Sequence, residues 1–141
     1  MKKQSLYFLT ILVLAGILLS ACSGGTSASL TGTWKLVSYE SPGNLTPAAP
    51  DVDASVIFGE DGTISGNVGC NSFGGDYKVD GDKITFGPIS STLMMCAEAA
   101  IGDQETAVLN TLTETVTFVI AGDKLTITSA DGSSVIVLAR K

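Results

Sequence analysis

The chain has 141 residues, with 14 Asp and Glu against 8 Lys and Arg, and it contains three Cys and no His. Nucleic-acid affinity depends on basic side chains that neutralise phosphates, so this acidic balance excludes nucleic acid as an expected partner. Without His, the common Ser–His and Cys–His catalytic arrangements are excluded, and two thiols beyond the N-terminal region are too few for a tetrahedral zinc site. We therefore expect no catalytic residues of these kinds, no metal and no cofactor.

The first 21 residues are typical of a secretory signal. Two lysines precede an apolar run over residues 6–19, a length that suits a signal peptide and is short for a membrane-spanning helix. The tetrad Leu19-Ser20-Ala21-Cys22 resembles the bacterial lipobox, in which the Cys is acylated on sulfur and becomes the first residue after cleavage. We expect residues 1–21 to be a lipoprotein signal peptide and Cys22 to be the lipidation site. The alternative is an uncleaved anchor or a plain secretory signal.

Residues 22–29 are expected to form a flexible tether after the lipidated Cys, because they are small and polar. Ser23 is not the Asp that, in the Gram-negative sorting rule, retains a lipoprotein at the inner membrane. We expect the protein to be lipid-anchored in the bacterial cell envelope, outside the cytoplasm, and at the outer membrane if the host has one. Attachment must come from the lipid, since removal of the signal leaves a net charge of −8, which anionic headgroups repel.

Residues 30–141 predict a single, mainly β domain. Alternation around Trp34 predicts a first strand over residues 30–39, with Trp34 as a core anchor, and three prolines within residues 40–53 predict a loop. The other expected strands are short runs between turns that mostly carry Gly with Asp, a hairpin signal. They are residues 55–58, 63–68, 73–79, 83–86, 89–95, 115–120, 124–128 and 134–139.

The hydrophobic period changes to that of a helix after Cys96. The helix ends near Leu112 and begins either at Ala97 or at Asp103, where Asp103 would be the N-cap and Glu105 would complement the helix dipole in the first turn. About eight short strands, with one helix before the last three, predict a strongly curved or closed antiparallel sheet whose opening the helix covers.

An ordered set of motifs runs through the domain. The motifs are Gly32-Thr33-Trp34-Lys35-Leu36, the stretch Gly69-Cys70-Asn71-Ser72-Phe73-Gly74-Gly75-Asp76-Tyr77, and residues 84–89, 91–96 and 122–127. Together they closely resemble the META/HslJ-like domain family. The resemblance implies a small cracked β-barrel with one helix, on envelope proteins linked to stress tolerance or secretion, and it implies no enzyme activity. Many members carry a basic residue after the Cys-Asn pair, where this chain has Ser72.

Cys70 and Cys96 are expected to form a disulfide, because an exported lipoprotein meets oxidising conditions. The alternative is two buried free thiols. Leu93, Met94 and Met95 either line a cavity for an acyl chain or apolar peptide or, as the favoured interpretation, pack in the core, where Met commonly fills gaps.

These patterns predict a monomeric, non-enzymatic lipoprotein. Its expected partners are the membrane, through the lipid at Cys22, and another envelope component, protein or lipid, in stress protection or in assembly and secretion. One alternative is a carrier of a hydrophobic ligand within the barrel. A further alternative is a hydrolase that uses two of the 14 carboxyl groups, although no motif marks such a pair.

Overall fold

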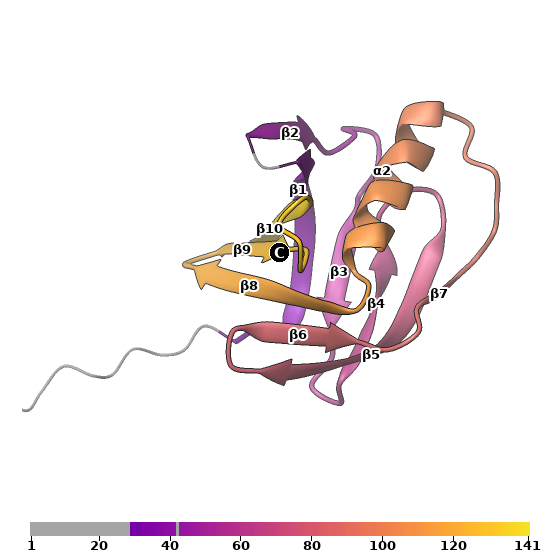
Figure 1. Cartoon of the computed structure of the whole chain (residues 1–141). Coiled ribbons are helices and arrows are strands. Elements are labelled where there is room, and N and C mark those ends of the chain that lie inside the picture. Colours follow the sequence, from indigo (N-terminus) through magenta and orange to yellow (C-terminus); the bar gives the residue numbers. More distant parts are fainter. Residues whose placement is uncertain (1–28, 42) are drawn as a thin grey trace, which may run out of the picture.

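The computed structural model describes residues 29–41 and 43–141, and the expected signal peptide, Cys22 and most of the tether lie outside this part of the chain. The described residues form a ten-stranded antiparallel sheet that closes on itself and carries one helix on its side (Figure 1). Among the described residues, no helix is long and apolar enough to cross a membrane.

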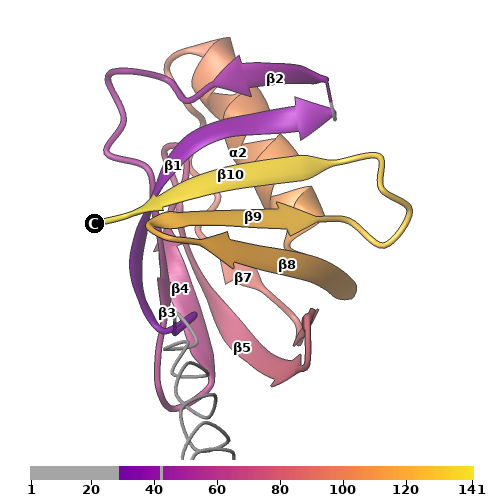
Figure 2. The same cartoon turned by 90° about the vertical axis from the view of Figure 1, so that its left-hand side faces the viewer.

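Eight of the strands form a closed barrel, in the order β10-β9-β8-β6-β5-β4-β3-β1, and the pairing of β1 with β10 completes the ring (Figure 2). They are β1 (Gly32–Ser41), β3 (Ser55–Phe58), β4 (Thr63–Asn67), β5 (Ser72–Asp80), β6 (Lys83–Phe86), β8 (Thr115–Ala121), β9 (Lys124–Thr128) and β10 (Val135–Arg140). The short β2 (Asn44–Pro47) adds to β1, and β7 (Ser90–Ser91) adds to β5. The expected mainly β barrel of about eight strands is confirmed.

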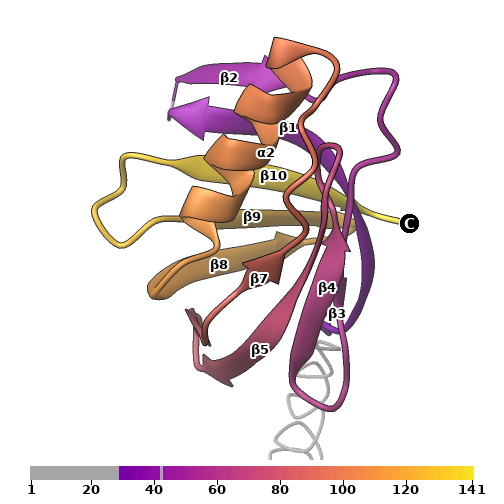
Figure 3. The same ribbon diagram turned by 90° about the vertical axis from the view of Figure 1, so that its right-hand side faces the viewer.

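The helix α2 (Ala99–Thr111) lies between β7 and β8 in the chain and packs beside β1 and β10 (Figure 3). The prediction of one helix before the last three strands is therefore confirmed. Its first residue agrees with neither expected start, and Glu98 rather than Asp103 is the N-cap. The alanines ahead of Gly102 favour helix strongly enough to place this Gly inside the helix.

The interior of the barrel is filled with apolar side chains. Trp34 is 0% exposed and donates a hydrogen bond from Nε1 to the backbone oxygen of Leu30 at 2.7 Å, while the guanidinium of Arg140 lies 4.2 Å from its ring centroid. The expected core role of Trp34 is confirmed. The other largest buried side chains are Phe58, Leu36, Ile64, Ile84, Leu112, Leu125, Ile127, Ile136 and Leu138.

Two segments differ from the sequence-based expectation. Residues 40–53, predicted as a loop, contain β2, which ends at Pro47. Proline is tolerated there because β2 is an edge strand and its outer side needs no N–H donor. The strand predicted over residues 89–95 is reduced to Ser90–Ser91, and the chain from Thr92 onward leaves the sheet.

Candidate functional site

Three segments meet beside the barrel: the corner that follows β4, the loop between β7 and α2, and the second turn of α2. Gly69 in the corner packs directly on the helix, since a Cβ at this position would lie 2.5 Å from Cβ of Glu105 and 3.0 Å from the carbonyl oxygen of Ile101. Only glycine allows this close approach. We call the polar group formed here, Cys70, Asn71, Thr92, Cys96 and Glu105, the Asn71 cluster.

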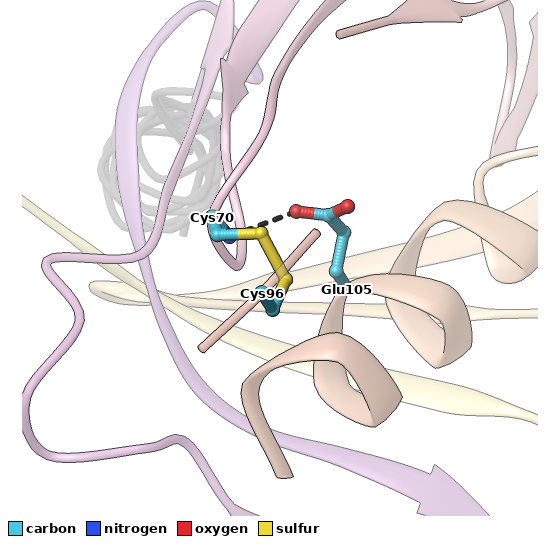
Figure 4. A group of neighbouring side chains, drawn as sticks. All are labelled: Cys70, Cys96 and Glu105. Carbon is cyan, nitrogen blue, oxygen red and sulfur yellow. Dashed lines mark hydrogen bonds between the residues drawn. A yellow bond between two sulfur atoms is a disulfide. The ribbon is translucent and has the colours of Figure 1, made fainter. Parts of the chain in front are cut away.

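A disulfide joins the corner to the loop. Cys70 and Cys96 are 26 residues apart in sequence, their Cα atoms are 5.6 Å apart, and both are partly buried (Figure 4). The structure thus contains the expected pairing, and the alternative of two free thiols does not describe it. The bond ties the exposed end of the loop to a corner that is anchored in the core through the fully buried Val68.

Glu105 holds the corner from the helix side. Its Oε2 accepts hydrogen bonds from the backbone N–H groups of Cys70 at 2.9 Å and Asn71 at 2.7 Å, the first of which is drawn in Figure 4. Its Oε1 accepts from Nδ2 of Asn71 at 2.7 Å. The expectation that Glu105 complements the dipole in the first turn is wrong, because α2 begins at Ala99. Instead, its carboxylate supplies the acceptor that two consecutive backbone N–H groups need.

Asn71 connects the corner to the loop. Asn71 is only 5% exposed. Its Oδ1 accepts hydrogen bonds from Met94 N at 2.7 Å and from Thr92 Oγ1 at 2.8 Å. Its Nδ2 also donates to the carbonyl oxygen of Met94 at 3.1 Å. A single side chain therefore satisfies both backbone polar groups of Met94, as a neighbouring strand would do.

Gln104 fixes the helix to the barrel rather than to the loop. It is 0% exposed, its Nε2 donates to the carbonyl oxygen of Val68 at 2.7 Å, and its Oε1 accepts from the backbone N–H of Ala49 at 2.7 Å. The sequence predicts no role for Gln104, and Asn71 stands out only as part of the motif over residues 69–77. For Gln104 a signal existed, because it occupies the apolar stripe of the helix four residues before Val108.

The loop that the Asn71 cluster holds exposes its apolar side chains. Leu93 is 95% exposed, Met94 is 62% exposed and Met95 is 97% exposed. Both sequence-based interpretations of these residues, cavity lining and core packing, are therefore wrong. The physical reason is that Asn71 binds the backbone of Met94, which turns that backbone toward the protein and leaves the side chains outside.

The cluster also has the composition of a metal site, since one ligand atom from each of Cys70, Cys96 and Glu105 lies within 4.8 Å of the others. The two sulfur atoms are bonded to each other, however, and both oxygens of Glu105 accept protein hydrogen bonds. In this state the three residues hold the fold together and offer no deprotonated sulfur ligand to a metal. Their arrangement gives no support to a metal centre.

One apolar hollow lies on the surface near this region. It has a volume of about 490 Å³ and lies between the end of β6 and the second half of α2, lined by Phe86, Pro88, Ile89, Leu109 and Leu112 among others. It is open to solvent, and its lining includes Phe86 and Leu112 from the core, while the barrel interior itself is filled with apolar side chains. The expected alternative of a ligand inside the barrel therefore gains no support from the packing.

Comparison with known proteins shows a recurrent fold. A protein from Burkholderia xenovorans solved by NMR has a TM-score of 0.64 and 22% identity, over 77% of this chain and 81% of that chain. A second protein solved by NMR has a TM-score of 0.60 and 22% identity, over 76% of this chain and 86% of that chain. A DUF4847 family protein from Bacteroides vulgatus ATCC 8482 has a TM-score of 0.56 and 15% identity, over 79% and 93% of the two chains. At these identities the likeness concerns the fold alone.

No curated protein matches the sequence. The sequence model of the META domain, in contrast, matches residues 28–141, a span that contains the whole barrel, the disulfide and the Asn71 cluster. The chain belongs to the META domain family.

Proposed function

We propose that this protein is an envelope lipoprotein, anchored in the membrane through acylated Cys22, whose META domain is a non-enzymatic module. The domain binds another envelope component in stress protection or in assembly and secretion. The observation that carries this proposal is that the buried polar side chains beside the barrel bind the protein itself and are not free to bind a substrate. Asn71, Gln104 and Glu105 all bind the protein's own backbone, so the best-built polar site of the described chain is structural.

The N-terminal sequence supports the anchor. The tetrad at residues 19–22 has the lipobox pattern, and residues 23–29 give a polar linker that reaches at most about 25 Å when fully extended. Two or three acyl chains on one residue give stable attachment where a single chain gives only marginal binding. A domain held in this way stays close to the membrane surface and meets other components of the envelope there.

Lipidation has a direct test. We expect an alkyne analogue of palmitate, fed to host cells, to label the wild-type protein and the matched control Ser23→Ala, and to leave Cys22→Ala unlabelled. Cys22→Ala should also lose its membrane association on fractionation. Label that persists in Cys22→Ala, or that never appears in the wild type, would refute the anchor.

The carboxyl groups of the described chain support a non-enzymatic role. A glycosidase needs one carboxyl whose pKa is raised, so that it remains protonated as a general acid. Among the described residues, the clear shifts go the other way: hydrogen bonds from Lys141 to Asp53, from Thr63 to Asp61 and from Ser129 to Asp131 lower the pKa of each carboxyl. These three groups are exposed turn or surface residues. Asp61 and Asp131 have local partners, and Asp53 forms an ion pair with Lys141.

A further inference from the structure

We infer that residues Leu93, Met94 and Met95, which we call the apolar loop, are the docking element of this domain. Their partner is a protein with an apolar pocket bordered by Lys or Arg side chains. This inference rests on the proposed function, because it names the surface through which the domain would bind another envelope component.

The exposure of the apolar loop is unusual for a soluble surface. Single exposed apolar residues are common, whereas three consecutive large ones, two of them more than nine-tenths exposed, form a continuous apolar projection. Methionine is frequent at binding surfaces because its unbranched, polarizable side chain adapts to the shape of a pocket. The projection has no packing role of its own that explains its composition.

The structure holds the apolar loop in place from both sides. On the N-terminal side, Thr92 N donates to the carbonyl oxygen of Ser72 at 3.0 Å, and Ser72 N donates to Oγ1 of Thr92 at 3.2 Å. In the middle, Asn71 binds both backbone groups of Met94, and on the C-terminal side Cys96 is fixed by the disulfide. A loop ordered before binding loses little conformational entropy when it binds. Buried polar groups and a disulfide thus orient side chains that are largely exposed to solvent.

The surroundings of the apolar loop define the charge of the partner. Residues 84–123 contain five acidic residues and no Lys or Arg. Of the five, Glu98 lies directly after the loop and Asp103 lies on α2, and both are exposed. An acidic border around an apolar projection complements a pocket with a basic border, and it repels anionic lipid headgroups.

The position of the loop agrees with a protein partner above the membrane. In Figure 1 the connection from β7 to α2 forms the right-hand edge of the molecule, whereas β1, the strand nearest the expected tether, begins at the lower left. The apolar loop is therefore remote from the place where the described chain begins, which leaves it accessible to a protein partner while the N-terminal side of the domain faces its anchor.

Site-specific photocrosslinking of the full chain in host cells tests the inference. The photoreactive residue p-benzoylphenylalanine replaces Leu93 or Met95, whose exposure allows a larger side chain, and replaces Val119 in a control. Val119 is 65% exposed on β8, which lies toward the other side of the molecule in Figure 1. We expect one protein to crosslink to positions 93 and 95 and not to position 119.

The protein identified by mass spectrometry is then purified and its affinity for the full-length lipoprotein in detergent is measured. We expect Met95→Ser and Leu93→Ser to weaken binding at least tenfold and Val119→Thr to leave it unchanged. Glu98→Lys should weaken binding several-fold, and added salt should reduce the affinity of the wild type more than that of this variant. Unchanged denaturation curves, read from Trp34 fluorescence, verify that the loop variants are folded.

Other outcomes overturn the inference. A crosslink from positions 93 and 95 to lipid or to a second copy of the chain would replace the proposed partner. A protein crosslinked only from position 119 would place binding on another surface, so the inference would fail while the proposed function stood. No crosslink from any of the three positions would count against both. An affinity unchanged by Met95→Ser and Leu93→Ser would also refute the docking role.

Discussion

Replacing Asn71 with Ala removes the side chain that joins the corner, the loop and the helix. Five side-chain hydrogen bonds are lost: two to the backbone of Met94, one from Thr92, one to Oε1 of Glu105 and one at 3.4 Å to Sγ of Cys70. A typical hydrogen bond contributes about 1 kcal/mol net, and one that involves a charged group contributes about 1.5–3 kcal/mol. Met94 and Thr92 are exposed, so water can replace Asn71 there, and most of the loss comes from Glu105. We expect Asn71→Ala to lower the free energy of unfolding by about 2–3 kcal/mol.

Guanidinium unfolding followed by tryptophan fluorescence measures this loss, because Trp34 is the only tryptophan and is fully buried. The exposed helix residue Asn110 supplies a matched control, and Asn110→Ala should change the free energy by less than about 0.5 kcal/mol. Because Asn71 and Glu105 are in contact, Asn71→Ala and Glu105→Ala should be non-additive by about 1 kcal/mol or more. Additive effects, or an Asn71→Ala curve that coincides with the wild type, would refute the structural role assigned to the cluster.

Three further changes test the same region and one remote turn. Replacing both Cys70 and Cys96 with Ala removes a cross-link between residues 26 apart in sequence. On the chain-entropy model this should lower the free energy of unfolding by about 3.5 kcal/mol, which calorimetry would record as a fall in Tm of about 10–15 °C. An unchanged Tm would contradict this expectation. Gly69→Ala should lower the free energy of unfolding by about 1–3 kcal/mol, because the added methyl group overpacks against α2. Gly74→Ala should lower it less, since the nearest atom to a Cβ there is 3.7 Å away. Equal denaturation midpoints for the two variants would contradict the close approach of Gly69 to the helix. Hydrogen bonds from Ser129 and Ser133 lower the pKa of Asp131 from 3.8 to about 2. The ionised Asp131 carboxyl therefore stabilises the fold above its unfolded pKa, and this stabilisation is lost as the pH falls toward 2. In Asp131→Asn, the free energy of unfolding should fall less steeply as the pH is lowered. An Asp131 carboxyl that titrates near pH 4 by NMR would contradict the shift.

Most of the barrel was predictable because its hairpins are local. The turns near Gly62 and Gly81 carry an Asp-Gly pair, and both glycines have positive φ, so the residue pattern and the backbone geometry express the same constraint. The strands β3, β6 and β9 coincide with their predicted limits. The start of the helix was less predictable, since several alanines favour helix equally and the N-cap, Glu98, makes no side-chain capping hydrogen bond that would mark the first turn.

The candidate site was only partly predictable. The two cysteines stood out, but the hydrogen bonds of Asn71 to Met94 and Glu105 span 23 and 34 residues, and no local pattern reports such contacts. The sequence Leu-Met-Met has the composition of a core segment, and composition alone predicts burial. This segment is exposed because β7 ends at Ser91 and because Asn71 binds the backbone of Met94. Both depend on tertiary contacts and not on the local sequence. An exposed docking loop and a buried strand can therefore have the same local sequence.

The closure of the barrel through β1 and β10 has a consequence for the order in which the domain is made. Trp34 on the first strand is opposite Arg140 on the last, so the ring cannot close until nearly the whole domain has been synthesised. A nascent chain that stops before residue 135 leaves β1 and β9 as open edges, and contacts so distant in sequence form slowly. During synthesis the chain therefore remains without its final topology, which is the condition in which a polypeptide can be threaded through a narrow translocation channel. Pairing of β10 with β1 is therefore the step that completes the folded barrel.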